Sequence, residues 1–188
     1  MEFLLALSMS ASRITAITPG SFARVLPSHV EAAFALEAAS YPADEAATLE
    51  NLQLRAEVAG DYFWGVSEGE VLNAFVCGTL TCGETLTEES MSVHEPAGTT
   101  LCIHSVVVAE EQRRLGLGTA MLKAYVKQVA DHTPVRTILF MCKKPLIPFY
   151  SDAGFTLVCQ SDVVHGLDPW FEMRCDTTVA ASSASNIS

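Results

Sequence analysis

Residues 101–122 read LCIHSVVVAEEQRRLGLGTAML and run from a strand pattern, through a loop with two glycines, into a helix pattern. The β-branched residues within Leu101–Val108 favour a strand. After the loop, Leu117, Met121 and Leu122 recur at helical spacing. A strand that passes through a loop and a helix to another strand is a parallel crossover. The stretch therefore predicts a mixed α/β domain.

The loop within this stretch has the chemistry of a phosphate-binding site. Arg113 and Arg114 supply positive charge, while Gly116 and Gly118 lack Cβ atoms and let a ligand approach the backbone. The free N–H groups and the dipole of the next helix favour an anion. Met121 stands where the dinucleotide pattern GxGxxG needs glycine, and the Walker pattern is absent. The remaining pattern, R-x-x-G-x-G, also fits an ordinary helix start with a glycine hinge.

The flanking sequence predicts the rest of one domain. We expect an antiparallel hairpin from the alternation in Tyr62–Val66 and Val71–Thr81, with Val135–Cys142 as a later strand. The other expected elements are a strand at Ile14–Ile17, a helix around Val30 and Phe34, a helix capped by Asp44 and ending near Val58, and a short helix at Leu146–Ala153 stopped by Gly154. The expected domain spans 14–176, between a flexible leader at 1–13 and a disordered tail at 177–188.

Composition and charge narrow the range of functions. The 188 residues carry 11 basic and 22 acidic side chains, a net charge of −11, which argues against a nucleic-acid partner. The acidic surface fits solubility or the steering of a cationic substrate. The run Phe3–Leu7 lacks the basic start of a signal peptide, and no segment is apolar for long enough to span a bilayer. The six cysteines lack zinc-site spacing, so we expect reduced thiols, no metal and a cytoplasmic location.

Together with this loop, the segments IHSVVV, RRLGLGTAML and LFMCKKPLIPFYSDAGF resemble the GNAT N-acetyltransferases, and among them the arylalkylamine branch. The similarity runs from about Thr18 to Cys175. It implies the GNAT fold, a mixed central β-sheet flanked by helices in a single domain. It also implies transfer of an acetyl group from acetyl-CoA to a small primary amine, of the serotonin, tryptamine, tyramine or phenylethylamine type, by direct attack in a ternary complex.

The resemblance assigns the cofactor site. Val106, Val107 and Val108 carry over as the strand segment that pairs with pantetheine through its backbone, although these valines also suit core packing. In this family a backbone N–H of that strand polarises the thioester oxygen. The residues that carry over to the CoA pyrophosphate are Arg113, Arg114, Leu115, Gly116, Leu117, Gly118 and Thr119.

The same resemblance assigns proton transfer. An alkylammonium has a pKa of about 10, so a base is needed at pH 7. His104 carries over as that base, with a structural histidine as the alternative. Cys102 falls on the first position of the H-x-H pattern of vertebrate members, where a neutral thiol is a poorer acceptor. Tyr150 carries over to the cofactor site as the acid that protonates the CoA thiolate, with a core tyrosine as the alternative.

The resemblance defines the acceptor amine and the partners of the protein less directly. Phe34, Pro42, Met141 and Trp170 match the arylalkyl pocket of the family, and each also suits plain core packing. Polyamines and peptide or protein amines are alternative acceptors, and a non-catalytic acyl-CoA sensor is a third possibility. The tails lack the basic phosphorylation motifs that recruit 14-3-3 proteins in the vertebrate branch. The resemblance suggests a monomer.

Overall fold

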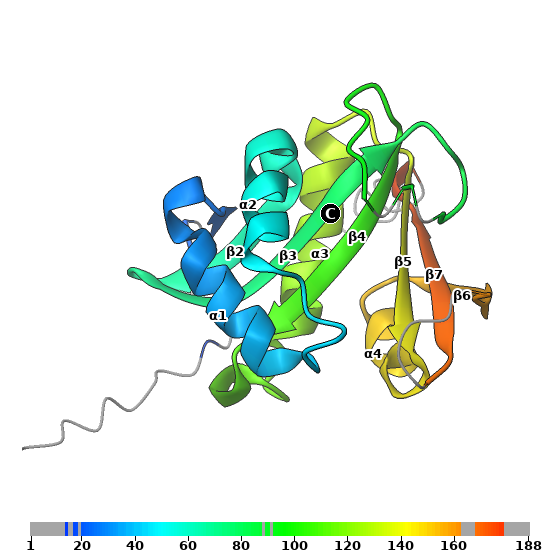
Figure 1. The fold of residues 1–188 in the computed structure, drawn as a ribbon. Helices are drawn as coiled ribbons and strands as arrows, with labels where there is room; N and C mark the ends of the chain where they lie inside the picture. Colours follow the sequence, from blue (N-terminus) through cyan, green and yellow to red (C-terminus); the bar gives the residue numbers. More distant parts are fainter. Residues whose placement is uncertain are drawn as a thin grey trace, which may run out of the picture.

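The computed structural model describes residues 14, 17–18, 20–87, 89–90, 92–162 and 168–178 (Figure 1). Its strands are β1 (Phe22–Arg24), β2 (Phe63–Glu68), β3 (Val71–Thr81), β4 (Thr100–Val108), β5 (Thr137–Lys143), β6 (Thr156–Gln160) and β7 (Trp170–Asp176). Its helices are α1 (Val30–Ser40), α2 (Leu49–Val58), α3 (Leu117–His132) and α4 (Ile147–Asp152). The hairpin, the crossover strand and helix, and the short helix before Gly154 are confirmed. Residues 1–13 and 179–188, which the sequence analysis assigned to a leader and a tail, lie outside the described residues.

The strands form one sheet of order β1-β2-β3-β4-β5-β7-β6. The parallel contact is between β4 and β5, joined by α3, whereas the other neighbouring strands are antiparallel. This parallel pairing covers only Thr100–Cys102 against Thr137–Leu139. Beyond it β4 and β5 diverge like the arms of a fork, as Figure 1 shows. The expected mixed α/β fold in a single domain is confirmed.

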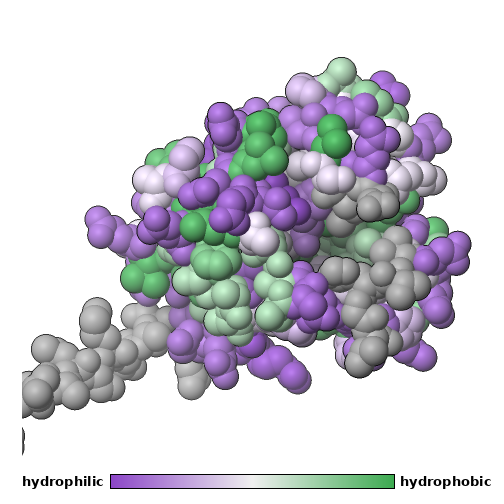
Figure 2. All heavy atoms as spheres, in the orientation of Figure 1, coloured by the Kyte–Doolittle hydropathy of each residue, from purple (hydrophilic) through white to green (hydrophobic). Residues whose placement is uncertain are grey.

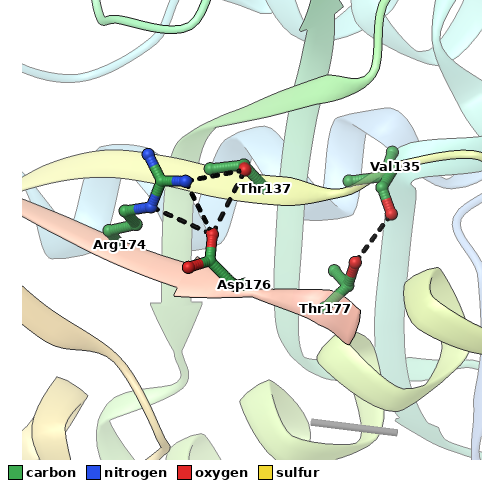
Figure 3. Close-up of polar contacts among 5 residues, drawn as sticks. All are labelled: Val135, Thr137, Arg174, Asp176 and Thr177. Atoms are coloured by element: carbon green, nitrogen blue, oxygen red, sulfur yellow. Dashed lines mark hydrogen bonds and ion pairs between the residues drawn. The ribbon is translucent and has the colours of Figure 1, made fainter. Parts of the chain in front are cut away.

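Side-chain contacts fasten the closed end of this fork (Figure 3). Thr137 accepts a hydrogen bond from Arg174 at 3.2 Å and donates one to Asp176 at 3.3 Å. The Thr177 hydroxyl donates to the Val135 carbonyl oxygen at 2.7 Å and is buried. These contacts hold β5 to β7 where β5 also meets β4. Thr177, which the sequence analysis assigned to the tail, therefore belongs to the packed domain.

Helices cover the two faces of the sheet differently. Helices α1 and α2 lie on one face and α3 on the other (Figure 1). On the α1–α2 face, Leu52 packs with Phe63 and Phe75. On the opposite face, Met121 and Tyr125 of α3 pack in a larger apolar cluster. Figure 2 shows hydrophilic side chains interspersed with hydrophobic ones over the α1–α2 side of the molecule, and a recess between this side and the part that holds β5 and β7.

Two predicted boundaries were wrong. The first strand among the described residues is Phe22–Arg24, which pairs with β2. Of the strand expected at Ile14–Ile17, the two ends lie outside any strand and residues 15 and 16 lie outside the described residues. The cap of α2 is Thr48, not Asp44. The Thr48 hydroxyl accepts a hydrogen bond from the Asn51 N–H at 3.2 Å, so the helix begins one turn later than expected. The segment 41–48 is instead a connection between α1 and α2.

Candidate active site

A β-bulge sets the direction of His104. Cys77 pairs with Ser105 and Gly78 pairs with Ile103, so the β3–β4 register skips His104. An extra residue of this kind bends its strand and re-aims the side chains around it. The strands come very close here, because a Cβ on Gly78 would lie 2.6 Å from a backbone oxygen of β4. Gly78 is therefore required for the bulge that presents His104.

The bulge also reverses the alternation of side chains along β4. Before it, Ile103 packs in the apolar cluster on the α3 face. After it, the Ser105 hydroxyl donates to Glu37 of α1 at 3.1 Å, on the opposite face. The His104 ring lies with its Nε2 2.7 Å from the Thr79 hydroxyl oxygen. The histidine thus stands where β4 leaves β5, on the side covered by α1 and α2.

The His104 imidazole is neutral at pH 7. Burial, reinforced by the positive charge of Arg55, lowers its pKa to about 3. Its Nδ1 is buried and has no hydrogen-bond partner among the described residues. Thr79 donates weakly to the Ser90 carbonyl oxygen at 3.4 Å, and in that arrangement His104 donates through Nε2. Nδ1 then carries a free lone pair. This pKa lies far below the near-neutral value expected from the sequence.

Glu37 is a second titratable group in the same cluster. Its Oε1 accepts hydrogen bonds from the Ser105 hydroxyl and, at 3.0 Å, from the Ala47 N–H. Its Oε2 is buried and unpartnered within the part of the chain that the structure describes. Burial raises the pKa of this carboxyl, against the lowering effects of its hydrogen bonds and of Arg55. Arg55, from α2, also buries a nitrogen that no described group satisfies.

Glu37 and Arg55 are not among the site residues predicted from the sequence. A signal for Glu37 was present, since it follows Val30 and Ala33 at helical spacing and shares their buried face. A carboxylate on the apolar face of a helix is rarely fully buried without a role. Arg55 carries no comparable signal, because a basic residue in the last turn of a helix is an ordinary stabilising feature.

Cys102 lies beside this cluster as a protonated thiol. It pairs with Thr79 across the β3–β4 ladder and is buried. Burial raises its pKa to about 11, with a smaller opposing effect from a hydrogen bond to Ser90. A thiol with this pKa keeps its proton at pH 7 and offers no base there. The described cysteines are all free, and four of the six are buried.

Two tyrosines approach the fork from opposite arms. Tyr150 of α4 is buried against Phe140 and Phe149, with ring centroids 4.5 and 4.7 Å away. Tyr41, just after α1, donates to the Val106 carbonyl oxygen at 3.3 Å. Burial raises the pKa of Tyr150 well above its usual value, and Tyr41 adds to the effect. The two hydroxyls are thus close enough to interact electrostatically, and both stay protonated at neutral pH.

The glycine loop has an open side. Gly116 adopts a left-handed conformation with φ of +87°, and a Cβ there would meet nothing within 4 Å. Arg114 is also left-handed, with φ of +63°, which is uncommon for a residue other than glycine. In the described chain no side chain caps the start of α3, so the first-turn N–H groups can serve a ligand. This geometry suits a phosphate group.

Two loop residues have structural partners. The Arg113 guanidinium donates to the Val108 carbonyl oxygen at 2.9 Å and to the Ser40 hydroxyl at 2.8 Å, so it braces the end of β4 against α1. A Cβ on Gly118 would lie 3.1 Å from the Phe149 ring, so this glycine lets α4 pack against α3. The carbonyls of Val106 and Val108 thus already accept one hydrogen bond each. Each oxygen has a second lone pair for another donor.

The four expected pocket residues separate into two places. Phe34 of α1 is partly buried and packs against the apolar cluster on the α1–α2 face. Met141 and Trp170 lie on the adjacent strands β5 and β7, and Pro42 lies in the 41–48 connection. An ion pair links that connection to β5, because Lys143 Nζ lies 2.8 Å from Glu45 Oε1. The same ammonium lies 4.1 Å from the centroid of the Trp170 ring.

The described residues contain no group of three or more histidine, cysteine, aspartate or glutamate side chains that would hold a metal ion. None of the described helices combines the length and apolar character needed to cross a membrane.

Comparison with known proteins gives concordant results. Residues 30–155 match the Acetyltransferase (GNAT) family. The chain is 34% identical over 108 residues to a serotonin N-acetyltransferase of Mesocricetus auratus, covering 57% of this chain and 52% of that protein. The chain thus spans about half the length of the curated relatives that it matches.

Solved structures share the fold at low identity. The GphF GNAT-like decarboxylase in complex with isobutyryl-CoA has a TM-score of 0.73 at 14% identity, covering 83% of this chain and 98% of that one. Diaminobutyrate acetyltransferase EctA from Paenibacillus lautus, in complex with its substrate and coenzyme A, has a TM-score of 0.59 at 17% identity, covering 83% and 94%. At such identities the likeness establishes the fold alone.

Proposed function

Because the chain belongs to the acetyltransferase (GNAT) family, we propose that it transfers an acetyl group from acetyl-CoA to the primary amine of a small arylalkylamine. The observation that carries this proposal is the cluster at the fork. A bulge presents a neutral histidine whose Nδ1 has no partner among the described residues, and a buried carboxylate with an oxygen that no described group satisfies lies on the same face. Paired acceptors of this kind suit removal of a proton from an ammonium ion.

Acetyl-CoA fits the loop and the diverging strand. The open side of Gly116 and the uncapped start of α3 would receive the pyrophosphate through the backbone of Arg114–Thr119. Arg113 would hold this loop in place through Val108 rather than contact phosphate directly. The edge of β4 at Val106–Val108, which has no β5 partner, would pair with pantetheine. Bound acetyl-CoA supplies the thioester that the amine attacks.

Proton removal would use both acceptors. With a pKa of about 3, His104 is unprotonated at pH 7 but is a weak base, so a proton taken from the ammonium stays on it only in passing. Glu37, whose pKa is raised by burial, is the stronger final acceptor. We propose that the ammonium proton passes to His104, directly or through water, and onward to Glu37. The amine nitrogen then attacks the thioester carbon in a ternary complex, and the C–S bond breaks.

The leaving thiolate would take its proton from Tyr150. A thiol has a pKa of about 8.5, so a phenol with a pKa well above 10 gives up its proton uphill. Tyr150 therefore assists the departure of the thiolate without being indispensable to it. The thiolate becomes CoA–SH, and the amine becomes its N-acetyl derivative once the second nitrogen proton has left and restored the Tyr150 phenol.

Two observations support an arylalkylamine as the acceptor: the apolar side chains near the fork and the curated relatives. Met141 and Trp170 border the β5 arm, and serotonin N-acetyltransferases match the chain at about a third identity. Polyamines and peptide amines stay alternatives. We further propose that the protein acts as a monomer in the cytoplasm, without nucleic-acid, membrane or 14-3-3 partners.

The test is CoA release by the full chain with acetyl-CoA and a panel of arylalkylamines, polyamines and peptides. Phenylethylamine, tryptamine, tyramine or serotonin should give the highest kcat/KM. Preference for a peptide or a polyamine would overturn the acceptor class. Calorimetric binding of acetyl-CoA without release for any amine would instead identify an acyl-CoA sensor. Arg174→Gln, at the closed end of the fork, serves as a control variant that should leave turnover unchanged.

A further inference from the structure

The Lys143 ammonium lies between a carboxylate and an aromatic ring. Lys143 Nζ lies 2.8 Å from the Glu45 carboxylate and 4.1 Å from the centre of the Trp170 ring. Its side chain is 20% exposed and that of Glu45 is 11% exposed, so both charges are largely withdrawn from water. A carboxylate beside the face of an aromatic ring is a combination that binds alkylammonium ions well. We refer to Glu45 and Trp170 as the ammonium box.

The ammonium box borders the proposed acceptor site. Lys143 follows Met141 by two residues on β5, so both side chains lie on the same face of that strand. Glu45 belongs to the 41–48 connection, which begins with Tyr41. The Tyr41 hydroxyl contacts Val106 on the other arm of the fork. An amine held between the arms would therefore have the box within reach of its far end.

Electrostatics determines which amines can bind beside the ammonium box while Lys143 occupies it. Lys143 and Glu45 together are neutral, so a second ammonium arriving there gains little attraction and meets a like charge. A tethered lysine also competes at high effective concentration against a free ligand. An acceptor whose far end is apolar meets no such opposition and packs beside Met141. The box without Lys143 would offer a bare carboxylate and a ring face to a diamine.

We propose that Lys143 determines acceptor selectivity by occupying the ammonium box, so that monoamines are accepted and diamines are rejected. This inference rests on the proposed function. It assigns to a residue of the β5 arm a role separate from proton transfer. Glu45 and Trp170 are the groups that recognise an ammonium, and the lysine takes the place of a substrate's second ammonium group.

The test uses Lys143→Met, which keeps side-chain length but removes the charge. Its kcat/KM for putrescine and cadaverine should rise about 10-fold, while that for phenylethylamine changes by less than about 3-fold. Lys143→Arg refills the box and should restore rejection of diamines. The matched control is Lys127→Met, which removes the exposed Lys127–Asp131 ion pair on α3 and should change neither class.

The double variant Lys143→Met with Glu45→Gln separates selectivity from structure. It should lose the gain with diamines, because the box then lacks its carboxylate. If Lys143→Met instead changes kcat/KM for monoamines and diamines in parallel, the lysine only links β5 to the 41–48 connection, and the proposal fails. Calorimetry with cadaverine in the absence of acetyl-CoA measures binding alone. It should detect binding to Lys143→Met and none to the double variant, even if acetyl transfer itself were disproved.

Discussion

The two faces of the central sheet differ in how completely their buried groups are satisfied. On the α3 face, Met121 and Leu122 pack fully buried among apolar neighbours, and the Tyr125 hydroxyl donates to the Tyr62 carbonyl oxygen at 2.8 Å. On the α1–α2 face, His104, Glu37 and Arg55 each bury a polar atom that no described group satisfies. Such atoms cost stability, because their lost hydration is not replaced. The core of the α3 face therefore contributes mainly to stability, whereas the proposed base and the buried groups beside it lie on the α1–α2 face.

The largest expected effect comes from His104→Gln. Loss of the base should lower kcat near pH 7 by roughly 100- to 1,000-fold, with partial recovery at high pH where more amine is neutral. Thermal stability should change little, because the histidine already leaves one nitrogen unsatisfied. Steady-state rates from pH 6 to 10 test this. An unchanged pH–rate profile would remove His104 from proton transfer.

Met121→Ala tests the opposite face. Truncating a fully buried methionine should cost about 2–5 kcal/mol of unfolding free energy through lost burial and a cavity. At a temperature where the variant stays folded, kcat should remain close to the wild-type value. Denaturant titration and turnover on the same preparation measure both. A loss of kcat at full folding would show that the two faces are not functionally separate.

The two proposed proton acceptors, His104 and Glu37, should change the unfolding free energy in opposite directions as the pH rises. The folded-state pKa of His104 is lowered to about 3 from its model-peptide value of 6.5, so its contribution is present above pH 6.5 and is lost as the pH falls toward 3. His104→Gln should therefore lose less stability than the wild type over this window. Glu37 has a raised pKa, so its contribution is present at low pH and is lost as the pH rises. Glu37→Gln should accordingly gain stability relative to the wild type as the pH rises. Thermal melts of the three proteins from pH 3.5 to 8 compare the slopes, and parallel curves would contradict both assignments.

The smallest effect is expected for Tyr150→Phe. Phenylalanine keeps the ring packing against Phe140 and Phe149, so stability should hold. Removal of the hydroxyl should lower kcat by about 10-fold, since a thiolate leaves tolerably without an acid. Single-turnover rates at saturating amine provide the measurement. A loss as large as that of His104→Gln would mean that the tyrosine has a role beyond protonating the thiolate.

Much of the architecture could be predicted from local pattern. The alternation in β2 and β3, the β-branched run in β4, and the spacing of Leu117 and Met121 in α3 all appear as expected. These signals are local because side-chain direction repeats every two residues in a strand and about every 3.6 in a helix. The position of the loop followed from the same reasoning. The N-cap of α2 was missed, because Asp44 and Thr48 are both good capping residues and the pattern alone does not choose between them.

The site depended on contacts between distant residues. The histidine was recognised from its strand, but its lowered pKa arises from burial and from Arg55, 49 positions earlier in the chain. Glu37 meets Ser105 only because α1 packs on β4. The role of Arg113 as a brace likewise requires Ser40 and Val108 to lie near each other.

Residues 101–122 alone determined the order of strand, loop and helix, because backbone periodicity and glycine conformation are local properties. Tertiary structure alone decided that β4 leaves β5 after Cys102, that a bulge at His104 places its ring beside Thr79, and that Lys143 contacts Glu45 and Trp170. These outcomes depend on register, burial and charge between segments far apart in the chain. No local pattern specifies such distances. The sequence therefore predicts the loop, whereas the arrangement of the groups around it follows only from the fold.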